Sequence, residues 1–170
     1  RGGRRVATHG GGSATAILAA AFAATPTRAD LLAFESGRGV RNSRGSDAWF
    51  LRYQHDMLPL WKTTGFIEVV GGSWDGDIKN RAVGAGGGLR YALTKRSYFS
   101  AAAGLAYVTD RTDNLGTHPQ FQWRVALGWR VGHVDLALAQ IHYSNGKSIF
   151  GWDGTNVGDN FLTLQIGYPP

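Results

Sequence analysis

Two side chains that can act together in catalysis, His142 and Ser144, lie near the C-terminal end of the chain. They are two residues apart in a stretch of alternating polarity, so a β-strand would place both on one face. A serine hydroxyl is a weak nucleophile until a neighbouring base takes its proton, and an imidazole can take it. The first chemical hypothesis is therefore a nucleophile with its general base. The structural alternative is a polar pair with no catalytic role.

The face that carries this pair is the apolar one. The even positions before His142 include Leu136 and Leu138, whereas the odd positions include Asp135 and several alanines. The end of an apolar stripe is an unusual place for catalysis in a water-soluble protein. In a membrane barrel the apolar face is the outside, so the pair would face lipid.

The N-terminal segment differs from the rest of the chain. Residues 1–29 contain four Arg, no acidic residue and an Ala-rich apolar run, which together are typical of a secretory signal peptide. The run is shorter than the roughly 20 apolar residues that a membrane-spanning helix needs. We therefore predict a signal peptide over 1–29 and one domain over 30–170, with a soluble N-terminal segment as the alternative.

Composition and charge narrow the kinds of site and partner. The chain has 170 residues and no Cys, which leaves no disulfide or thiolate-bound metal. Of its 18 basic residues, four lie in the predicted signal peptide, so the remainder carries 14 basic against 12 acidic residues. We infer no nucleic-acid partner from this balance. No His spacing suggests a metal site.

From Asp30 onward the chain reads as eight strand-like segments separated by turns, most of them about 10 residues long, enough for a tilted strand to cross a bilayer. The segments are 30–38, 47–56, 64–75, 82–93, 97–109, 119–132, 133–145 and 159–168. In the fourth, fifth, sixth and eighth segments, one face is mostly aliphatic with aromatic residues towards its ends, and the other is small or polar. The predicted fold is all-β, an eight-stranded antiparallel transmembrane β-barrel. A soluble lipocalin-like barrel, with its apolar face inside, is the alternative.

Two motifs carry a resemblance to a known family. They are His142-Tyr143-Ser144-Asn145 in the seventh segment and Asn156-Val157-Gly158-Asp159-Asn160-Phe161 at the start of the eighth. With the secretion signal and eight strands, the chain from Asp30 to Tyr168 resembles the lipid A 3-O-deacylase family of outer-membrane acyl hydrolases.

The resemblance implies a location in the bacterial outer membrane and hydrolysis of the ester-linked acyl chain at the 3-position of lipid A in lipopolysaccharide. It implies Ser144 as the nucleophile, His142 as the general base and later the general acid, and an acyl-enzyme formed without metal or cofactor. It also points to Asn156 and Gly158 as parts of the supporting loop.

The third catalytic residue is where the chain departs from the family pattern. The family has a Glu four residues after the Asn that matches Asn156, and this chain has Asn160 there. Asn160 shares its face with Leu162 and with the pair, whereas Asp159 points to the lumen unless a bulge shifts the register. We expect Asn160 to orient His142, with Asp159 as the bulge-dependent alternative, and reduced activity because an amide supplies no charge.

The oxyanion site and the lipid contacts follow from the residues around the pair. The backbone N–H groups of Asn145 and Gly146, directly after the nucleophile, are the natural oxyanion donors. Lys147 and Arg111 are candidates for the lipid A phosphates, although a single loop cation is more often simply solvated. Phe150 and Trp152, in the loop from 146 to 155, are candidates for contact with the membrane surface.

Two matters stay open from the sequence. One is a rival function, a non-enzymatic small outer-membrane barrel that serves adhesion, membrane integrity or binding. The other is whether the barrel forms a homodimer.

Overall fold

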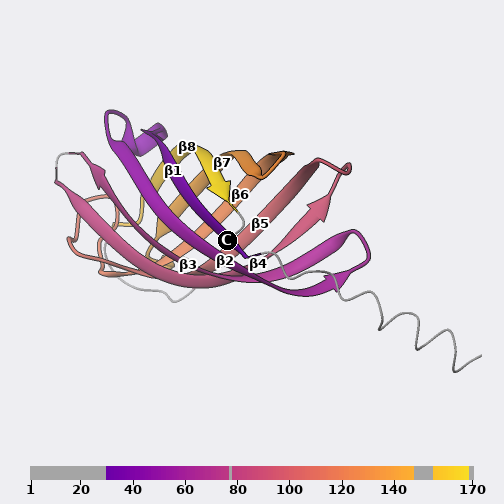
Figure 1. Ribbon diagram of the computed structural model, residues 1–170. Coiled ribbons are helices and arrows are strands. Elements are labelled where there is room, and N and C mark those ends of the chain that lie inside the picture. The colour runs from indigo at the N-terminus through magenta and orange to yellow at the C-terminus, as the bar shows by residue number, and fades with distance from the viewer. Residues whose placement is uncertain (1–29, 77, 148–154, 169–170) are drawn as a thin grey trace, which may run out of the picture.

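The chain folds into a closed barrel of eight antiparallel strands (Figure 1). The computed structural model describes residues 30–76, 78–147 and 155–168. Its elements are β1 (Leu31–Gly39), a short 3-10 helix η1 (Arg41–Ser43), β2 (Asp47–Leu60), β3 (Thr63–Asp75), β4 (Asn80–Ala92), β5 (Ser97–Val108), β6 (Pro119–Val131), β7 (Val134–Ser144) and β8 (Asp159–Tyr168). Each strand pairs with the next, and β1 pairs with β8 to close the barrel. The predicted fold is confirmed.

Most predicted strand boundaries agree with the observed ones to within two residues, and β2 is the exception. We expected it to end at residue 56, and this was wrong, because it continues to Leu60. A register irregularity between Asp56 and Pro59 interrupts its pairing with β3. A bulge of this kind breaks the alternation of side chains and accommodates a proline, so the final four residues do not read as strand.

The outer wall of the barrel is apolar. Many large aliphatic side chains along the strands are exposed, and the most exposed include Val83 at 64%, Leu105 at 63% and Leu164 at 68%. A folded protein exposes such a continuous apolar band only where lipid covers it. The soluble alternative, with this face inside, is therefore wrong.

Charged and polar side chains fill the lumen. The Arg52 guanidinium lies 3.1 Å from Glu35 Oε1 and 2.6 Å from Glu68 Oε1, and Arg124 lies 2.9 Å from the same Glu35 oxygen. These four side chains are almost fully buried, so each charge has to be compensated inside the barrel. The small-or-polar face predicted from the alternation is therefore the inner face.

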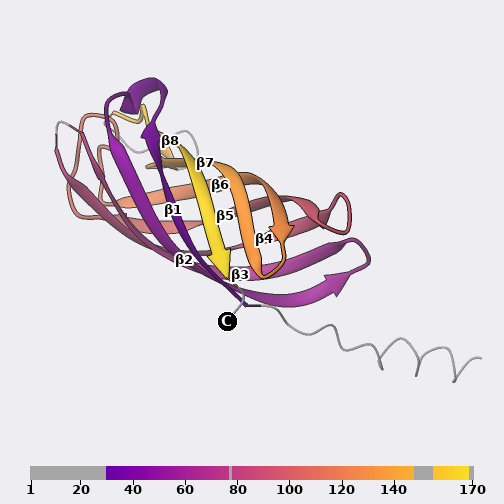
Figure 2. The same cartoon turned by 45° about the horizontal axis from the view of Figure 1, so that its top comes forward.

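The two ends of the barrel differ (Figures 1 and 2). At one end, here called the turn end, lie residues 61–62, 93–96 and 132–133, together with the start of β1 and the end of β8. The β2–β3 and β4–β5 hairpins project beyond β1 and β8 at this end. The opposite end, called the loop end, carries the described residues of the connections after β1, β3, β5 and β7, which are 40–46, 76, 78–79, 109–118, 145–147 and 155–158.

Four buried aromatic rings close the lumen near the loop end. Phe50, Trp74, Tyr143 and Phe161 pack together with ring centroids 5.2 to 6.4 Å apart. They come from β2, β3, β7 and β8, so their packing joins strands that are distant in sequence.

Two further observations concern the rest of the chain. The predicted signal peptide, residues 1–29, lies outside the described residues. No helix in the described part of the chain is long and apolar enough to cross a membrane.

Candidate active site

His142 and Ser144 lie on the outer wall of the barrel, at the end of β7 that adjoins the loop end. Ile141 and Tyr143 alternate with them and are fully buried in the lumen, whereas His142 and Ser144 are half-buried. The strand therefore directs the imidazole and the hydroxyl to the same outward side, as the alternation predicts.

The neighbouring strands decide what surrounds the imidazole. His142 lies opposite Trp123 of β6 on one side and Asn160 of β8 on the other. The Trp123 and His142 rings are 5.2 Å apart between centroids. Ser144 lies opposite Phe121 of β6. The Trp123 ring therefore packs beside the imidazole on the outer wall.

A hydrogen bond defines the tautomer of His142. Its Nδ1 lies 3.0 Å from Oδ1 of Asn160, which is itself only 4% exposed. Because an amide oxygen can only accept, Nδ1 carries the proton and the lone pair is on Nε2. An imidazole in this tautomer can accept a proton from a hydroxyl at Nε2.

Gly158 lies directly against the imidazole. A Cβ at this position would be 2.5 Å from Cε1 of His142, and the backbone φ of +75° is one that side chains rarely adopt. The N–H of Gly158 donates to the Asn114 carbonyl at 2.9 Å, which holds the strand against the β5–β6 loop. Glycine is needed here for both its backbone conformation and its lack of a side chain.

Asp159 points into the lumen. Its carboxylate accepts hydrogen bonds from Ser43 Oγ at 2.9 Å, Asn114 Nδ2 at 2.9 Å and Trp74 Nε1 at 3.1 Å. The β7–β8 pairing runs without a bulge through Asp159 and Asn160. The bulge that would turn Asp159 towards His142 is therefore missing from this pair of strands.

Ser43 connects the lumenal and outer sides of β8. Its Oγ donates to Asp159 and accepts the backbone N–H of Asn160 at 2.9 Å. The carbonyl of Asn160 accepts from Val40 N at 2.8 Å. The β1–β2 loop thus holds the backbone of Asn160 at both its N–H and its carbonyl.

The chain after Ser144 is held by asparagines. The N–H of Asn145 donates to Asn156 Oδ1 at 3.0 Å, and Asn145 Nδ2 donates to the Thr155 carbonyl at 2.9 Å. Asn145 Oδ1 accepts the Lys147 N–H at 3.0 Å. Gly146 follows with a φ of +68°. The Asn145 N–H, one of the two expected oxyanion donors, therefore already has an acceptor in this structure.

The hydroxyl and the imidazole are not hydrogen-bonded to one another. Within the described ranges no hydrogen bond joins Ser144 to His142. In ligand-free enzymes such contacts are often long and tighten only when substrate binds. The same ranges contain no cluster of His, Asp and Glu that could hold a metal ion.

The cations named from the sequence lie in different places. Lys147 is exposed in the turn that follows Ser144, whereas Arg111 lines a polar cavity of about 450 Å³ at the loop end. Arg41, which sequence reasoning missed, is exposed in the β1–β2 loop, directly after Val40, whose N–H donates to the Asn160 carbonyl at 2.8 Å. Phe150 and Trp152 lie outside the described residues.

Sequence reasoning also missed Trp123 and Ser43. Counting back from the two-residue turn at Gly132-His133 would have placed Trp123 opposite His142. No sequence signal pairs Ser43 with Asp159, because 116 residues separate them and two loops determine the contact.

The fold and the site together define a class, the eight-stranded membrane β-barrels that carry a Ser, His and Asn group on their outer wall. The family model described as "Lipid A 3-O-deacylase (PagL)" matches residues 47–169. The chain therefore belongs to the lipid A 3-O-deacylase family, as the resemblance of its motifs implies, and it is a β-barrel of the bacterial outer membrane.

Solved structures with the same architecture support the fold. The crystal structure of the outer membrane enzyme PagL is 19% identical, covers 82% of this chain and 99% of its own, and superposes with a TM-score of 0.71. A de novo designed transmembrane β-barrel is 16% identical over 82% of this chain and 93% of its own, with a TM-score of 0.59. The Yersinia pestis outer membrane protein Ail is 9% identical, covers 83% of this chain and 98% of its own, and has a TM-score of 0.54. No curated protein sequence matches the chain.

Proposed function

We propose that this protein hydrolyses the ester-linked acyl chain at the 3-position of lipid A, with Ser144 as nucleophile and His142 as base. The observation that carries the proposal is the contact of His142 Nδ1 with Asn160 Oδ1 at 3.0 Å on the outer wall, on the face that presents Ser144. Membership of the lipid A 3-O-deacylase family supports the choice of substrate.

The first half of the reaction forms an acyl-enzyme. Nε2 of His142 takes the proton of the Ser144 hydroxyl, and Oγ attacks the ester carbonyl of the 3-acyl chain. The tetrahedral intermediate then collapses. The bond to the sugar oxygen breaks, and His142 returns its proton to that oxygen to give the free 3-hydroxyl of lipid A.

The second half releases the fatty acid. Water enters in place of the sugar, gives a proton to His142 and attacks the acyl carbonyl. The acid leaves and the proton returns to Ser144, so no metal or cofactor takes part. Asn160 keeps the proton on Nδ1 throughout but, being neutral, adds no charge to stabilise the imidazolium.

The negative charge on the tetrahedral oxygen needs donors. We assign this role first to the Gly146 N–H, because the Asn145 N–H is donated to Asn156 Oδ1. The Asn145 N–H joins it if that bond opens when substrate binds. Asn156 and Gly158 then act as supports, one holding the turn after the nucleophile and the other giving the imidazole its space.

The position of the site suits a substrate that stays in the membrane. In bacterial outer-membrane barrels the longer loops face the outside of the cell, so the loop end lies in the outer leaflet. The acyl chain can reach Ser144 sideways along the apolar wall, without leaving the lipid. Arg41 and Lys147, both exposed beside the site, are placed to meet the phosphates of lipid A.

The test is the lipid A profile of a Gram-negative host that expresses the chain. We expect the wild type to remove one 3-hydroxyacyl mass, and Ser144→Ala to remove none. Ser36→Ala is the matched control, because Ser36 is an exposed serine on the outer face of β1, opposite Leu164 and away from the site. An unchanged profile from a wild-type barrel folded in the outer membrane would refute the proposal.

The neutral Asn160 favours a second candidate, a non-enzymatic barrel that retains the family's site without its acidic residue. The same experiment distinguishes the two candidates. If the barrel is not an enzyme, the folded wild type and the Ser144→Ala variant will give the same lipid A profile.

A further inference from the structure

The turn end of the barrel, opposite the candidate active site, carries an unusual concentration of positive charge. Five cationic side chains line one cavity of about 200 Å³, and no acidic side chain lines it. They are Lys62, Arg90, Lys95, Arg96 and Arg130. They belong to the β2–β3 turn, to β4, to the β4–β5 turn and to the end of β6, so the fold gathers them from separate parts of the chain.

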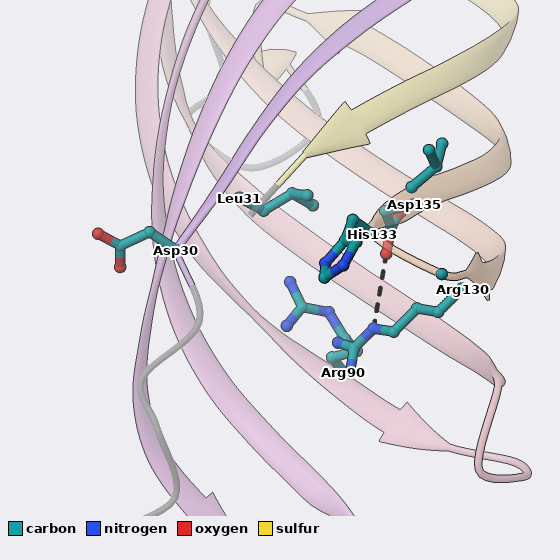
Figure 3. A pocket seen from close by; sticks show the side chains of 8 residues that line it. Asp30, Leu31, Arg90, Arg130, His133 and Asp135 are labelled. Atoms are coloured by element: carbon teal, nitrogen blue, oxygen red, sulfur yellow. Dashed lines mark ion pairs between the residues drawn. The ribbon is translucent and has the colours of Figure 1, made fainter. Parts of the chain in front are cut away.

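Two of these cations also border a second cavity. Arg90 and Arg130 both line an adjoining space of about 110 Å³ that reaches His133 and Asp135 (Figure 3). Their guanidinium carbons lie 5.5 and 5.7 Å from the centre of the Tyr98 ring. The figure shows both side chains extending into the same opening. The guanidinium groups of Arg90 and Arg130 therefore line both cavities.

The acidic residues nearby compensate only part of the cluster's charge, because two carboxylates, Asp56 and Asp135, pair with two of the five cations. Asp56 accepts two hydrogen bonds from Arg90, at 2.8 and 2.9 Å. Asp135 is engaged by Tyr98 and Gln165 at 2.6 and 2.8 Å and lies 3.7 Å from Arg130. The Asp30 side chain points away from the opening (Figure 3). Its carboxylate accepts from Tyr53 Oη at 2.6 Å and lies 2.7 Å from His55 Nδ1.

The remaining three cations pair with no carboxylate of the described residues. Among the described residues, Lys62, Lys95 and Arg96 form no salt bridge, and Lys62 lies over the Trp61 ring at 5.0 Å. Arg90, which is only 6% exposed, keeps Nε without a hydrogen-bond acceptor. A cluster with this excess of donors over acceptors is suited to bind an anion with several oxygens.

The surroundings place the cluster at the membrane surface. Large apolar side chains face outward beside it, including Leu60, Trp61 and Leu93, with Trp61 90% exposed. Tryptophan beside lysine and arginine is typical of the level of the lipid headgroups. An anion at this height is therefore the phosphate of a phospholipid in the adjacent leaflet or a phosphate dissolved in the water beyond it.

We propose that the turn end holds a phosphate-binding site, formed by Lys62, Arg90, Lys95, Arg96 and Arg130 around the shared opening. Arg90 and Arg130 form its inner wall, and the three turn cations close it from outside. Guanidinium groups match phosphate oxygens in pairs, and ammonium groups add charge without fixed geometry. Nη1 and Nη2 of Arg90 already donate to Asp56 and Gln54, so the paired donors come from Arg96 and Arg130, and Arg90 contributes charge. The site is independent of the proposed deacylase reaction.

The test titrates inorganic phosphate into the full barrel, held in a detergent that contains no phosphate. Amide NMR shifts of residues 62, 94–97 and 130 are the readout. We expect a saturable shift confined to these residues. The variant Lys95→Gln/Arg96→Gln should bind about tenfold more weakly or worse, since each surface cation contributes strongly to anion binding.

The matched control is Lys79→Gln/Arg81→Gln, which removes the same two charge types from exposed positions at the loop end. It should bind phosphate as the wild type does. Absence of saturation, or equal weakening in both variants, would overturn the proposal.

A second titration, with short-chain phosphatidylglycerol in the same micelles, identifies the source of the phosphate. Tighter binding of the lipid at the same residues, with displacement of inorganic phosphate, assigns the site to a headgroup. Binding of inorganic phosphate alone assigns it to a soluble ligand. If neither binds, the barrel has no such site.

Discussion

Asn160 accepts the Nδ1 proton of His142 at 3.0 Å from the outer face of β8, while Asp159, one residue earlier, faces the lumen. The residue that contacts the imidazole is thus neutral. The neighbouring carboxylate of Asp159 accepts hydrogen bonds from Ser43, Asn114 and Trp74 instead. An amide in this place selects the tautomer but leaves the imidazolium without an opposite charge. The contact between His142 and Asn160 therefore orients the proposed base without supplying a charge.

Restoring the charge should raise the rate. We expect Asn160→Asp to increase kcat for release of the 3-acyl chain by about tenfold or more, since a carboxylate stabilises the imidazolium. Fatty-acid release from lipid A in mixed micelles measures it. Asn160→Ala should lower kcat, because nothing then defines the tautomer. Equal rates in Asn160→Asp, Asn160→Ala and the wild type would show that Asn160 does not act on His142.

The imidazole should be displaced by any side chain at position 158. Gly158→Ala introduces a Cβ at 2.5 Å from His142 Cε1, and we expect a loss of kcat of about tenfold or more. Gly132→Ala is the control, because Gly132 also has a positive φ, +62°, but a Cβ there meets nothing within 4 Å. Both variants carry the backbone strain, so a similar rate in both would contradict the proposed contact.

Ser43 should affect both the stability of the barrel and the position of Asn160 beside His142. Ser43→Ala removes the acceptor for Asn160 N–H and the donor to Asp159, which should cost about 1–3 kcal/mol in the free energy of unfolding. We also expect kcat to fall while KM changes little, because Asn160 is then less well held. Urea unfolding in liposomes and the release assay measure the two effects. A stability loss with wild-type kcat would limit Ser43 to a structural role.

The lumenal ion pairs should dominate barrel stability. Arg52→Met leaves the carboxylates of Glu35 and Glu68 buried with less compensation, and we expect a loss of about 3–5 kcal/mol in the free energy of unfolding. Arg38→Met breaks an ion pair with Asp47 whose side chains are 82% and 71% exposed, and should cost less than about 1 kcal/mol. Comparable losses would mean that the lumen is better hydrated than its burial indicates.

Alternation alone was enough to predict much of this molecule. It assigned His142 and Ser144 to the apolar face, and it placed Asn160 on that face and Asp159 on the other, because the period of a strand is two residues. The turn at Gly132-His133 also determines the register of β6 and β7, so the Trp123 contact was accessible from the sequence.

The contacts made by loops were not accessible in this way. The β1–β2 loop brings Ser43 to Asp159, and no periodicity relates those positions. The end of β2 was missed for a similar reason, because the irregularity between Asp56 and Pro59 breaks the pattern on which the prediction relied. Local patterns determine which face a side chain occupies, whereas loop packing determines its partner.

The central claim, a covalent intermediate on Ser144, has a direct measurement. The purified barrel is mixed with lipid A, quenched in acid during turnover and digested, and the peptides are analysed by mass spectrometry. We expect a 3-hydroxyacyl adduct on the peptide that contains Ser144, and no adduct in Ser144→Ala. Release of the acyl chain by Ser144→Ala at the wild-type rate, with no adduct in either protein, would contradict the account.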